Sequence, residues 1–438
     1  MLSARCARCL ARHGVHYGWV MVALTFLTML ATAAAMSMPG VLLVPLRNEF
    51  TWNATQISGA LALRLLLFGL TGPFAAALML RYGLKATVCA ALGLIVCGLA
   101  GATAMRHVWQ LWLYWGVMVG LGTGMTAIVL GATVANRWFV AQRGLVLGLL
   151  TASAATGQLV FLPAAAWLAQ THGWRLAVLP PILACMAAAV ALVLFGADDP
   201  IEVGQRPYGA RDGQPPDDVS ARDTRLGRPS AGAVRTAFAT LAEASGQRLF
   251  WMLFATFAVC GFTTTGLVQS HFIATCLDSG MTEVAAAGVL ALMGLFDFVG
   301  TIGSGWLSDR FDNRWLLFWY FALRGVALLI LPLSSFTLAG LSVFAVFYGL
   351  DWIATVPPTV KLASGVCGRE RAPLVFGWIF TGHQLGAALA VVGAGLSRDV
   401  LNSYLPAYLV GGALCVAAAS AAVLVRPAQS RVATRIRA

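Results

Sequence analysis

Residues 292–311 read LMGLFDFVGTIGSGWLSDRF, an apolar run with one carboxylate, Asp297, in its middle and a charged pair, Asp309 and Arg310, near its end. A run of about 20 apolar residues crosses a bilayer as a helix. A carboxylate at the centre of such a helix costs roughly 2.5–3.5 kcal/mol on insertion scales. The stretch therefore predicts a membrane-spanning helix whose buried acid is kept for a function.

The whole chain has the composition of a membrane protein. Of its 438 residues, 59% are hydrophobic and 11% are charged, whereas soluble domains carry about 25% charged residues. The apolar runs predict an all-α membrane protein with twelve transmembrane helices. The predicted spans are residues 17–45, 54–80, 84–105, 108–134, 143–169, 174–197, 249–276, 284–307, 314–333, 337–361, 372–396 and 403–425.

The distribution of Lys and Arg predicts the orientation. With the N-terminus inside, the inner segments hold 23 of the 29 basic residues, and the outer loops hold four: Arg47, Arg106, Arg175 and Arg398. Because basic residues accumulate on the cytoplasmic side, we expect both termini in the cytoplasm and the protein in the inner (plasma) membrane. The net charge of +12 is spread over every inner loop, so it is a topology signal, and nucleic-acid binding is not expected.

Polar segments divide the chain into two halves. Residues 1–16 form a basic cytoplasmic leader without an apolar core or cleavage site, so no cleaved signal peptide is expected. Residues 198–247 are rich in Pro, Gly, Asp and Arg, and we expect an unfolded cytoplasmic linker there. This linker separates six spans in residues 17–197 from six in residues 248–425, and residues 426–438 form a cytoplasmic tail.

The two halves match each other at a constant offset of 229 residues. The matches fall in the loop after the second span and in the fifth span of each half. An even number of spans per half makes the repeats parallel, as in secondary transporters with a substrate site between the halves. The matching pairs are Arg81 and Arg310, Tyr82 and Phe311, Lys85 and Arg314, Gly148 and Gly377, and Gly157 and Gly386.

Residues 305–314, GWLSDRFDNR, resemble the loop motif Gly-x-x-x-Asp-Arg-x-Gly-Arg-Arg of the major facilitator superfamily. The copy in the first half retains Arg81, Gly83 and Lys85. Three other stretches, HYGWVMVA, EFTWNATQISGA and GLTGPFAAALMLRYG, resemble the monocarboxylate and oxalate–formate branch of that superfamily. The resemblance implies a secondary transporter with the twelve-helix major facilitator fold.

The charged loops predict a cytoplasmic gate. Asp309 and Arg310 follow the eighth span, and Arg81 follows the second. A short charged loop at a helix end can pair with a neighbouring helix in one conformation and release it in another. The alternative is that these residues only anchor the loops at the inner surface.

Four ionisable residues of the second half lie at mid-depth: Asp297, Arg324, Asp351 and His383. Their depth follows from counting about 1.5 Å per residue from the nearest inner loop, across a hydrocarbon core about 30 Å thick. Each of them requires a partner or a wet cavity. We expect Arg324 to form a buried ion pair, with Asp297 or Asp351 as its partner.

Asp297 and Asp351 are the candidates for proton coupling, because a proton-coupled carrier needs a protonatable group in its path. The resemblance to the monocarboxylate branch implies an arginine four residues after the acid of the eighth span. This chain has Thr301 there, so Asp297 lacks that neighbour. Asp351 precedes Pro357 and Pro358, and it marks either a moving helix or a cap for a backbone donor that the prolines free.

Candidate substrate contacts lie in both halves. Arg64 lies in the second span, Gln158 in the fifth, and His383 and Gln384 in the eleventh, where the resemblance to oxalate–formate carriers implies a lysine. A buried arginine or a protonated histidine can hold a carboxylate. The alternative for His383 is a structural histidine bonded to nearby groups.

These residues predict a proton-coupled secondary transporter of a small organic anion, a monocarboxylate, that works by alternating access. One alternative is an exporter of a neutral or cationic compound that uses the two buried acids. Another is a membrane sensor that reports a ligand through the linker. The sequence holds no catalytic constellation and no cofactor motif, so an enzyme is not expected. The expected partners are the substrate, protons and the lipid bilayer, with the chain as a monomer.

The cysteines indicate no paired framework. Cys260, like the other cysteines within the spans, is expected to behave as a small hydrophobic residue. Cys6 and Cys9, followed by His13 and His16, have a spacing that can hold a metal ion. The alternative is a disordered, Arg-rich leader without a metal site.

Overall fold

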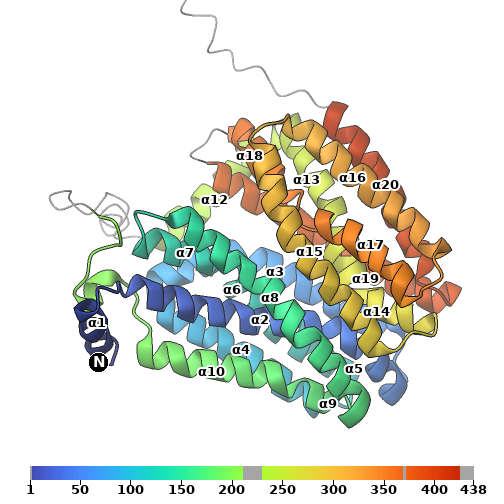
Figure 1. Cartoon of the computed structure of the whole chain (residues 1–438), viewed down its shortest axis with the longest axis horizontal. Coiled ribbons are helices and arrows are strands. Elements are labelled where there is room, and N and C mark those ends of the chain that lie inside the picture. Colours follow the sequence, from blue (N-terminus) through green and yellow to red (C-terminus); the bar gives the residue numbers. More distant parts are fainter. Residues whose placement is uncertain (1, 211–228, 368–370, 425–438) are drawn as a thin grey trace, which may run out of the picture.

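The computed structural model describes residues 2–210, 229–367 and 371–424, which are almost wholly helical (Figure 1). The first half contains α2 (Gly18–Phe50), α3 (Ala54–Tyr82), α4 (Leu84–Thr103), α5 (Val108–Leu111), the π-helix η1 (Trp112–Val119), α6 (Gly120–Met125), α7 (Ile128–Trp138), α8 (Arg143–His172), α9 (Trp174–Ala177) and α10 (Leu179–Phe195). The second half contains α13 (Arg248–Gly261), the π-helix η3 (Phe262–Val268), α14 (Gln269–Asp278), α15 (Glu283–Ser308), α16 (Asn313–Ile330), η4 (Leu331–Leu333), α17 (Leu338–Asp351), α18 (Val356–Cys367), α19 (Ala372–Leu401) and α20 (Leu405–Leu424). Outside the halves lie α1 (Leu2–Arg12), η2 (Pro200–Val203) and α12 (Pro229–Ser245).

The helices follow the predicted spans in order. Eleven helical segments among the described residues are long and apolar enough to cross a membrane, and α8 lies where the fifth span was predicted. In Figure 1 the first half, coloured blue to green, lies beside the second half, coloured yellow to red. Among the described residues, the most extensive contacts between the halves are those of α3 with α19, α8 with α15, and α2 with α14. We call the end at which α2 begins the leader end, and the end at which α3 begins the far end.

Helix ends near the charged groups follow from local sequence. Asn53 Oδ1 accepts a hydrogen bond from Gln56 N at 2.7 Å and Gln56 Oε1 accepts one from Asn53 N at 3.2 Å, so a capping box begins α3. The tenth span breaks after Asp351, and α18 then starts with Pro357 and Pro358 in its first turn. Proline is tolerated in a first turn because the missing N–H has no partner inside the helix there. The break leaves Asp351 at a helix end.

Two glycines bring helices close together beside the buried charges. A Cβ on Gly120 of α6 would lie 3.1 Å from both the Cα and the carbonyl oxygen of Arg64, so α6 packs directly on the backbone of α3. A Cβ on Gly300 of α15 would overlap the carbonyl oxygen of Leu350 on α17. Such small residues permit close helix packing within a membrane. They hold Arg64 and the surroundings of Asp297 in fixed positions.

Parts of the leader and the linker are helical, in contrast to the unfolded linker that composition predicts. α12 packs against α3, α18 and α19, and the ring centroids of Phe238 and Trp378 lie 5.6 Å apart. α1 packs against α10 and η2. Composition missed these helices because tertiary contacts, more than intrinsic propensity, stabilise short amphipathic helices. Residues 211–228 of the linker and 426–438 of the tail lie outside the described residues.

Candidate functional site

The two buried acids of the second half have different partners. Arg324 on α16 is 1% exposed and donates from Nε to Asp351 Oδ2 at 2.7 Å. Its Nη2 donates to the carbonyl oxygens of Asp351 and Trp352, the latter at 3.1 Å. Asp351 Oδ1 is buried and has no hydrogen-bond partner in the described part of the chain. Of the two partners expected for Arg324, the structure selects Asp351.

Cys260 on α13 connects this ion pair to His383. Arg324 Nη1 donates to Cys260 Sγ at 3.1 Å, and Thr355 Oγ1 lies 3.3 Å from the same sulfur. His383 on α19 also interacts with the thiol. The expectation that Cys260 acts only as a small hydrophobic residue is therefore wrong. The guanidinium of Arg324 and the turn after α17 converge on its sulfur, so the thiol has polar partners.

Asp297 lies on α15 and does not share the Arg324 ion pair. Its Oδ1 accepts hydrogen bonds from Ile353 N at 2.9 Å and from Thr301 Oγ1 at 3.1 Å, and the residue is 7% exposed. Ile353 belongs to the turn between α17 and α18, where the broken helix frees a backbone donor. Among the described residues, Oδ1 takes both of these bonds and Oδ2 takes none. The second oxygen therefore remains available to a proton.

Arg64 is the buried cation of the first half. It lies on α3, is 3% exposed, and donates from Nη1 to the carbonyl oxygen of Met36 on α2 at 2.9 Å. Its Nε is buried without a hydrogen bond. Within the ranges that the structure describes, no carboxylate pairs with it. A guanidinium has five N–H donors, so Arg64 has donors left for a ligand.

His383 and Gln384 lie on α19, where this helix meets α3. The imidazole lies between the rings of Phe257 and Phe380, with centroid distances of 5.0 and 5.5 Å. Gln384 Nε2 lies 3.3 Å from His383 Nδ1, while its Oε1 is buried without a partner. On the other side, the ring of Phe380 lies 6.1 Å from that of Phe68 on α3. Aromatic rings of both halves therefore meet at this contact, beside the polar pair of the second half.

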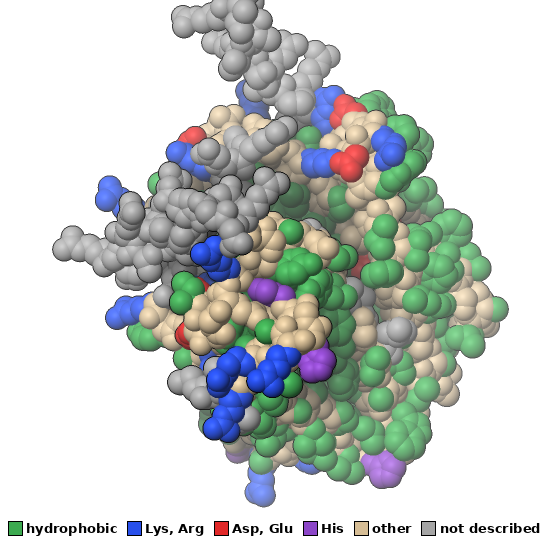
Figure 2. Space-filling model, turned by 60° about the vertical axis from the view of Figure 1, so that its left-hand side comes forward, with side chains coloured by type: hydrophobic (Ala, Val, Ile, Leu, Met, Phe, Trp, Pro, Cys, Tyr) green, Lys and Arg blue, Asp and Glu red, His purple; other side chains and the backbone are tan. Residues whose placement is uncertain are grey.

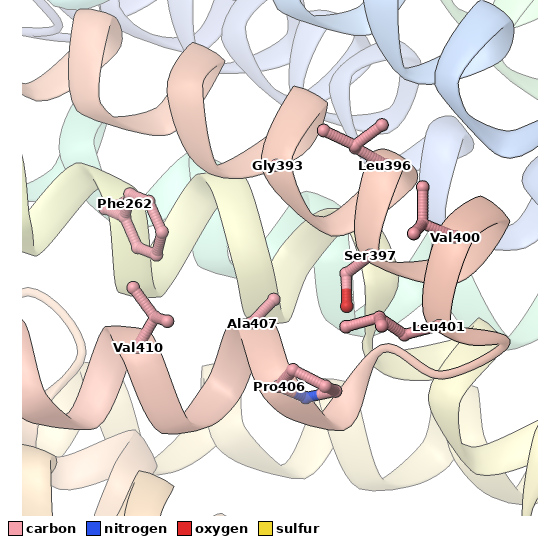
Figure 3. Close-up of a pocket in the computed structure, with 9 residues that line it drawn as sticks. All are labelled: Phe262, Gly393, Leu396, Ser397, Val400, Leu401, Pro406, Ala407 and Val410. Carbon is pink, nitrogen blue, oxygen red and sulfur yellow. The ribbon is translucent and has the colours of Figure 1, made fainter.

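Two further observations bear on the location of the site. Gln158 is on α8, but its side chain is outside the described residues. A groove of about 350 Å³ lies between α19, α20 and η3 and contains none of the predicted residues (Figure 3). Its lining is apolar apart from Ser397, whose hydroxyl donates to the Ser403 carbonyl oxygen at 2.7 Å. We therefore place the candidate site at the buried charges and not in this groove.

At the leader end, Asp309 forms an ion pair with Lys361 on α18. The hydrogen bond from Lys361 lowers the pKa of the Asp309 carboxyl below its usual value. Arg310 turns back onto its own helix, with its guanidinium carbon 4.1 Å from the ring centroid of Trp306. The guanidinium of Arg81 lies 5.1 Å from the centroid of the adjacent tyrosine ring. Among the described residues, Asp309 is thus the predicted gate residue with a side-chain bridge to another helix.

At the far end, a carboxylate that the sequence did not single out joins the halves. Asp399 on α19 accepts hydrogen bonds from Ala54 N at 2.9 Å and Thr55 N at 2.8 Å, at the start of α3. A carboxylate at a helix N-terminus interacts favourably with the unpaired N–H groups and the helix dipole. A Cβ on Gly395 would lie 2.6 Å from Ser58 Oγ, so α19 and α3 also pack closely here. The halves are therefore in contact at the far end.

Cys6, Cys9, His13 and His16 do not converge on a metal site. His13 Nδ1 lies 3.0 Å from the Cys9 carbonyl oxygen, and His16 Nε2 lies 2.8 Å from that of Arg206. In the described parts of the chain, no three His, Cys, Asp or Glu side chains are grouped as metal ligands. The histidines instead stabilise the leader and its contact with the segment after α10.

Two helical halves with buried charges beside their interface define a membrane transporter built from repeats. The chain belongs to the Major Facilitator Superfamily, whose model matches residues 25–391 and 280–437. It is similar to Monocarboxylate transporter 13 of Rattus norvegicus, with 26% identity, covering 92% of this chain and 87% of the relative. It is also similar to the uncharacterized MFS-type transporter YcxA of Bacillus subtilis, with 24% identity, covering 83% of this chain and 84% of the relative.

Two solved structures share the fold. The bacterial homolog of the human lysosomal transporter Spinster has a TM-score of 0.70 and 16% identity, covering 93% of this chain and 95% of its own. The xylose transporter XylE of E. coli has a TM-score of 0.68 and 13% identity, covering 92% and 96%. These comparisons confirm the predicted twelve-helix major facilitator fold and the resemblance to the monocarboxylate branch. The relatives and fold neighbours are transporters and not enzymes.

Proposed function

We propose that this transporter carries a small organic anion, a monocarboxylate, together with a proton by alternating access. The observation that supports the anion is Arg64, a buried cation with an unbonded Nε and no carboxylate partner among the described residues. A buried charge inside a membrane protein is costly unless it faces a partner, a ligand or a wet cavity. A substrate carboxylate would supply the missing charge and accept two parallel hydrogen bonds from the guanidinium.

The second half would complete the anion site. His383 and Gln384 lie where α19 meets α3, and Gln384 Oε1 has no partner there. We assign these residues, and Gln158 on α8, as further substrate contacts. The names of the monocarboxylate transporters to which the chain is similar support the same substrate class.

We assign proton coupling to Asp297 and a structural role to Asp351. Asp297 Oδ2 has no hydrogen bond among the described residues, whereas Asp351 is held by Arg324. Protonating Asp297 would weaken its bond to Ile353 N and so act on the turn between α17 and α18. An exporter of cations would use both buried acids, but Arg324 already neutralises one of them. The ion pair therefore favours the anion over the cation.

We also propose that the leader end faces the cytoplasm, with the chain as a monomer in the inner membrane and both termini inside. The excess of Lys and Arg in the segments at that end supports this orientation. Asp309, Arg310 and Arg81 then lie at the cytoplasmic gate.

The test uses Arg64→Gln beside two controls. Purified protein is mixed with a panel of small monocarboxylates, and binding is measured as a rise in melting temperature. Arg64→Gln should fold, because removing an unpaired buried charge relieves a desolvation cost, but it should lose the carboxylate response. Arg64→Lys should keep part of the response because the charge remains. The exposed Arg106→Gln should respond like the wild type.

Two outcomes would contradict the proposal. One is an Arg64→Gln variant that carboxylates stabilise as strongly as they stabilise the wild type. The other is a wild-type protein that organic cations stabilise and carboxylates do not.

A further inference from the structure

We propose that the outward face of α1 binds the anionic headgroups of membrane phospholipids at the leader end. This inference concerns a surface outside the transport site and goes beyond the proposed function. The inner face of α1 packs against α10 and η2. On this face Ser3 is 8% exposed and Ala7 is 1% exposed. The opposite face carries three exposed arginines, Arg5, Arg8 and Arg12, at the i, i+3 and i+7 spacing of one helix face.

The arginines surround one concave surface. Together with Cys9, they line a hollow of about 200 Å³ on the outside of α1. Guanidinium groups match phosphate oxygens with paired hydrogen bonds, which makes arginine the side chain suited to a phosphate-bearing headgroup. Figure 2 shows Lys and Arg side chains gathered on this face of the molecule, next to apolar surface. Arg5 and Arg12 therefore give the hollow charge and donors for a phosphodiester.

The position of α1 matches the headgroup level. It lies across the end of α10 in Figure 1, so its axis crosses those of the spanning helices and does not continue them. The junction after α1 is fixed: Tyr17 OH donates to the Phe195 carbonyl oxygen at the end of α10 at 2.5 Å, and Tyr17 N donates to Gln205 Oε1 at 3.0 Å. The end of a spanning helix marks the border of the hydrocarbon core. A helix held there lies in the interface, as amphipathic surface helices do.

The charge of this region complements an anionic membrane. α1 contains no acidic residue, and the acids of the neighbouring segment bond to backbone groups. Asp198 accepts from Lys85 N at 2.6 Å, Asp199 from Ile201 N at 3.0 Å, and Glu202 from Asp198 N at 3.0 Å. Basic residues at a membrane surface are attracted by anionic lipids over about a Debye length. Phospholipid is the anion that is always present at that depth.

The test measures lipid affinity with the full-length protein. Purified protein in a neutral detergent is titrated with short-chain phosphatidylglycerol or phosphatidylcholine, and bound lipid is counted by native mass spectrometry. We expect tighter binding of phosphatidylglycerol, weakened by added salt. Arg5→Gln with Arg12→Gln should weaken it roughly fivefold for each arginine removed. The far-end control Arg106→Gln should leave it unchanged, and Arg12→Lys should keep most of it.

Melting temperature in detergent alone shows whether each variant folds, and little change is expected because both substituted side chains face outward. Equal affinity for the two lipids, or wild-type affinity in the double variant, would overturn the proposal. Glycerol 3-phosphate, a soluble phosphate ester, is the competitor that distinguishes a lipid headgroup from a free phosphate ester. If it displaces phosphatidylglycerol at a comparable concentration, the hollow is a site for free phosphate esters, and the assignment to lipid is overturned.

Discussion

Replacing Asp351 with leucine is expected to destabilise the protein by about 3–5 kcal/mol, because this change leaves the guanidinium of Arg324 buried without its counter-ion. Arg324 is 1% exposed and cannot turn to solvent. Its remaining acceptors would be two backbone carbonyls and the thiol of Cys260. These satisfy donors but supply no full negative charge.

Matched variants separate the charge from the hydrogen bond. Asp351→Asn keeps an oxygen that can accept from Arg324 Nε, so it loses the charge interaction alone and should cost less than the leucine variant. Arg324→Met by itself leaves the Asp351 carboxylate unpaired and should also cost about 3–5 kcal/mol. The double variant Arg324→Met/Asp351→Leu buries no charge and should be close to, or above, wild-type stability.

The assay is equilibrium unfolding of the purified proteins in mixed detergent micelles, analysed as a double-mutant cycle. The expected coupling is several kcal/mol, because the two single losses should largely disappear in combination. Additive losses in the double variant would refute the ion pair as the source of the stability. An Asp351→Leu variant with the same stability as the wild type would also refute it.

Three further predictions concern other carboxylates. Asp297→Asn should fold normally, since Arg324 keeps its partner Asp351. In proteoliposomes it should lose pH-dependent accumulation of substrate while retaining substrate exchange. Substrate accumulation with unchanged pH dependence would disprove the coupling role. Asp399→Asn should weaken closure of the far end, because a neutral side chain interacts less with the helix dipole of α3. A cysteine introduced as Ser58→Cys should then react faster with an impermeant maleimide in the Asp399→Asn background than in the wild-type background. Equal labelling rates in the two backgrounds would count against this prediction. Lys361→Gln should melt slightly below the wild type at neutral pH. Lys361 lowers the pKa of the Asp309 carboxyl in the folded protein. The stabilisation from this ion pair is therefore fully present above the pKa of aspartate in the unfolded chain, about 3.9. It is lost as the pH falls through the pKa of Asp309 in the folded protein. A difference that vanishes well above pH 3.9 would contradict this sign.

The spanning helices could be predicted from sequence because the bilayer imposes their length and composition. Hydropathy located α15 and α19 to within a few residues, and the shared offset indicated two halves. The break of the tenth span followed from Pro357 and Pro358. The position of a residue along its helix could also be predicted, because the rise per residue is constant. These features depend on local sequence and on the membrane as solvent.

Which side chains meet across helices could not be predicted. Counting residues along the helices predicts similar depths for Asp297 and Asp351, and depth does not specify the rotation of a helix about its axis. The structure shows that Arg324 faces α17 and that Asp297 faces the turn after it. Cys260 gave no signal, because its polar contacts exist only after three helices have packed. The same holds for α12, which is positioned by its contacts with α3, α18 and α19.

At the Asp399 contact, a side chain of α19 accepts hydrogen bonds from two backbone N–H groups of α3. The hydrogen bonds therefore depend on the residue type at position 399 but not on the side chains of α3. Residue 55 can vary without loss of the backbone hydrogen bonds, unless proline removes a donor. Ala54 is fully buried, so packing restricts that position to small side chains. Position 399 must keep its carboxylate. Paired substitutions would therefore not accompany this contact, and methods that infer proximity from covariation would miss it. Saturation mutagenesis scored by transport should find position 399 restricted to its carboxylate, position 54 restricted to small residues by packing, and position 55 permissive to all residues but proline.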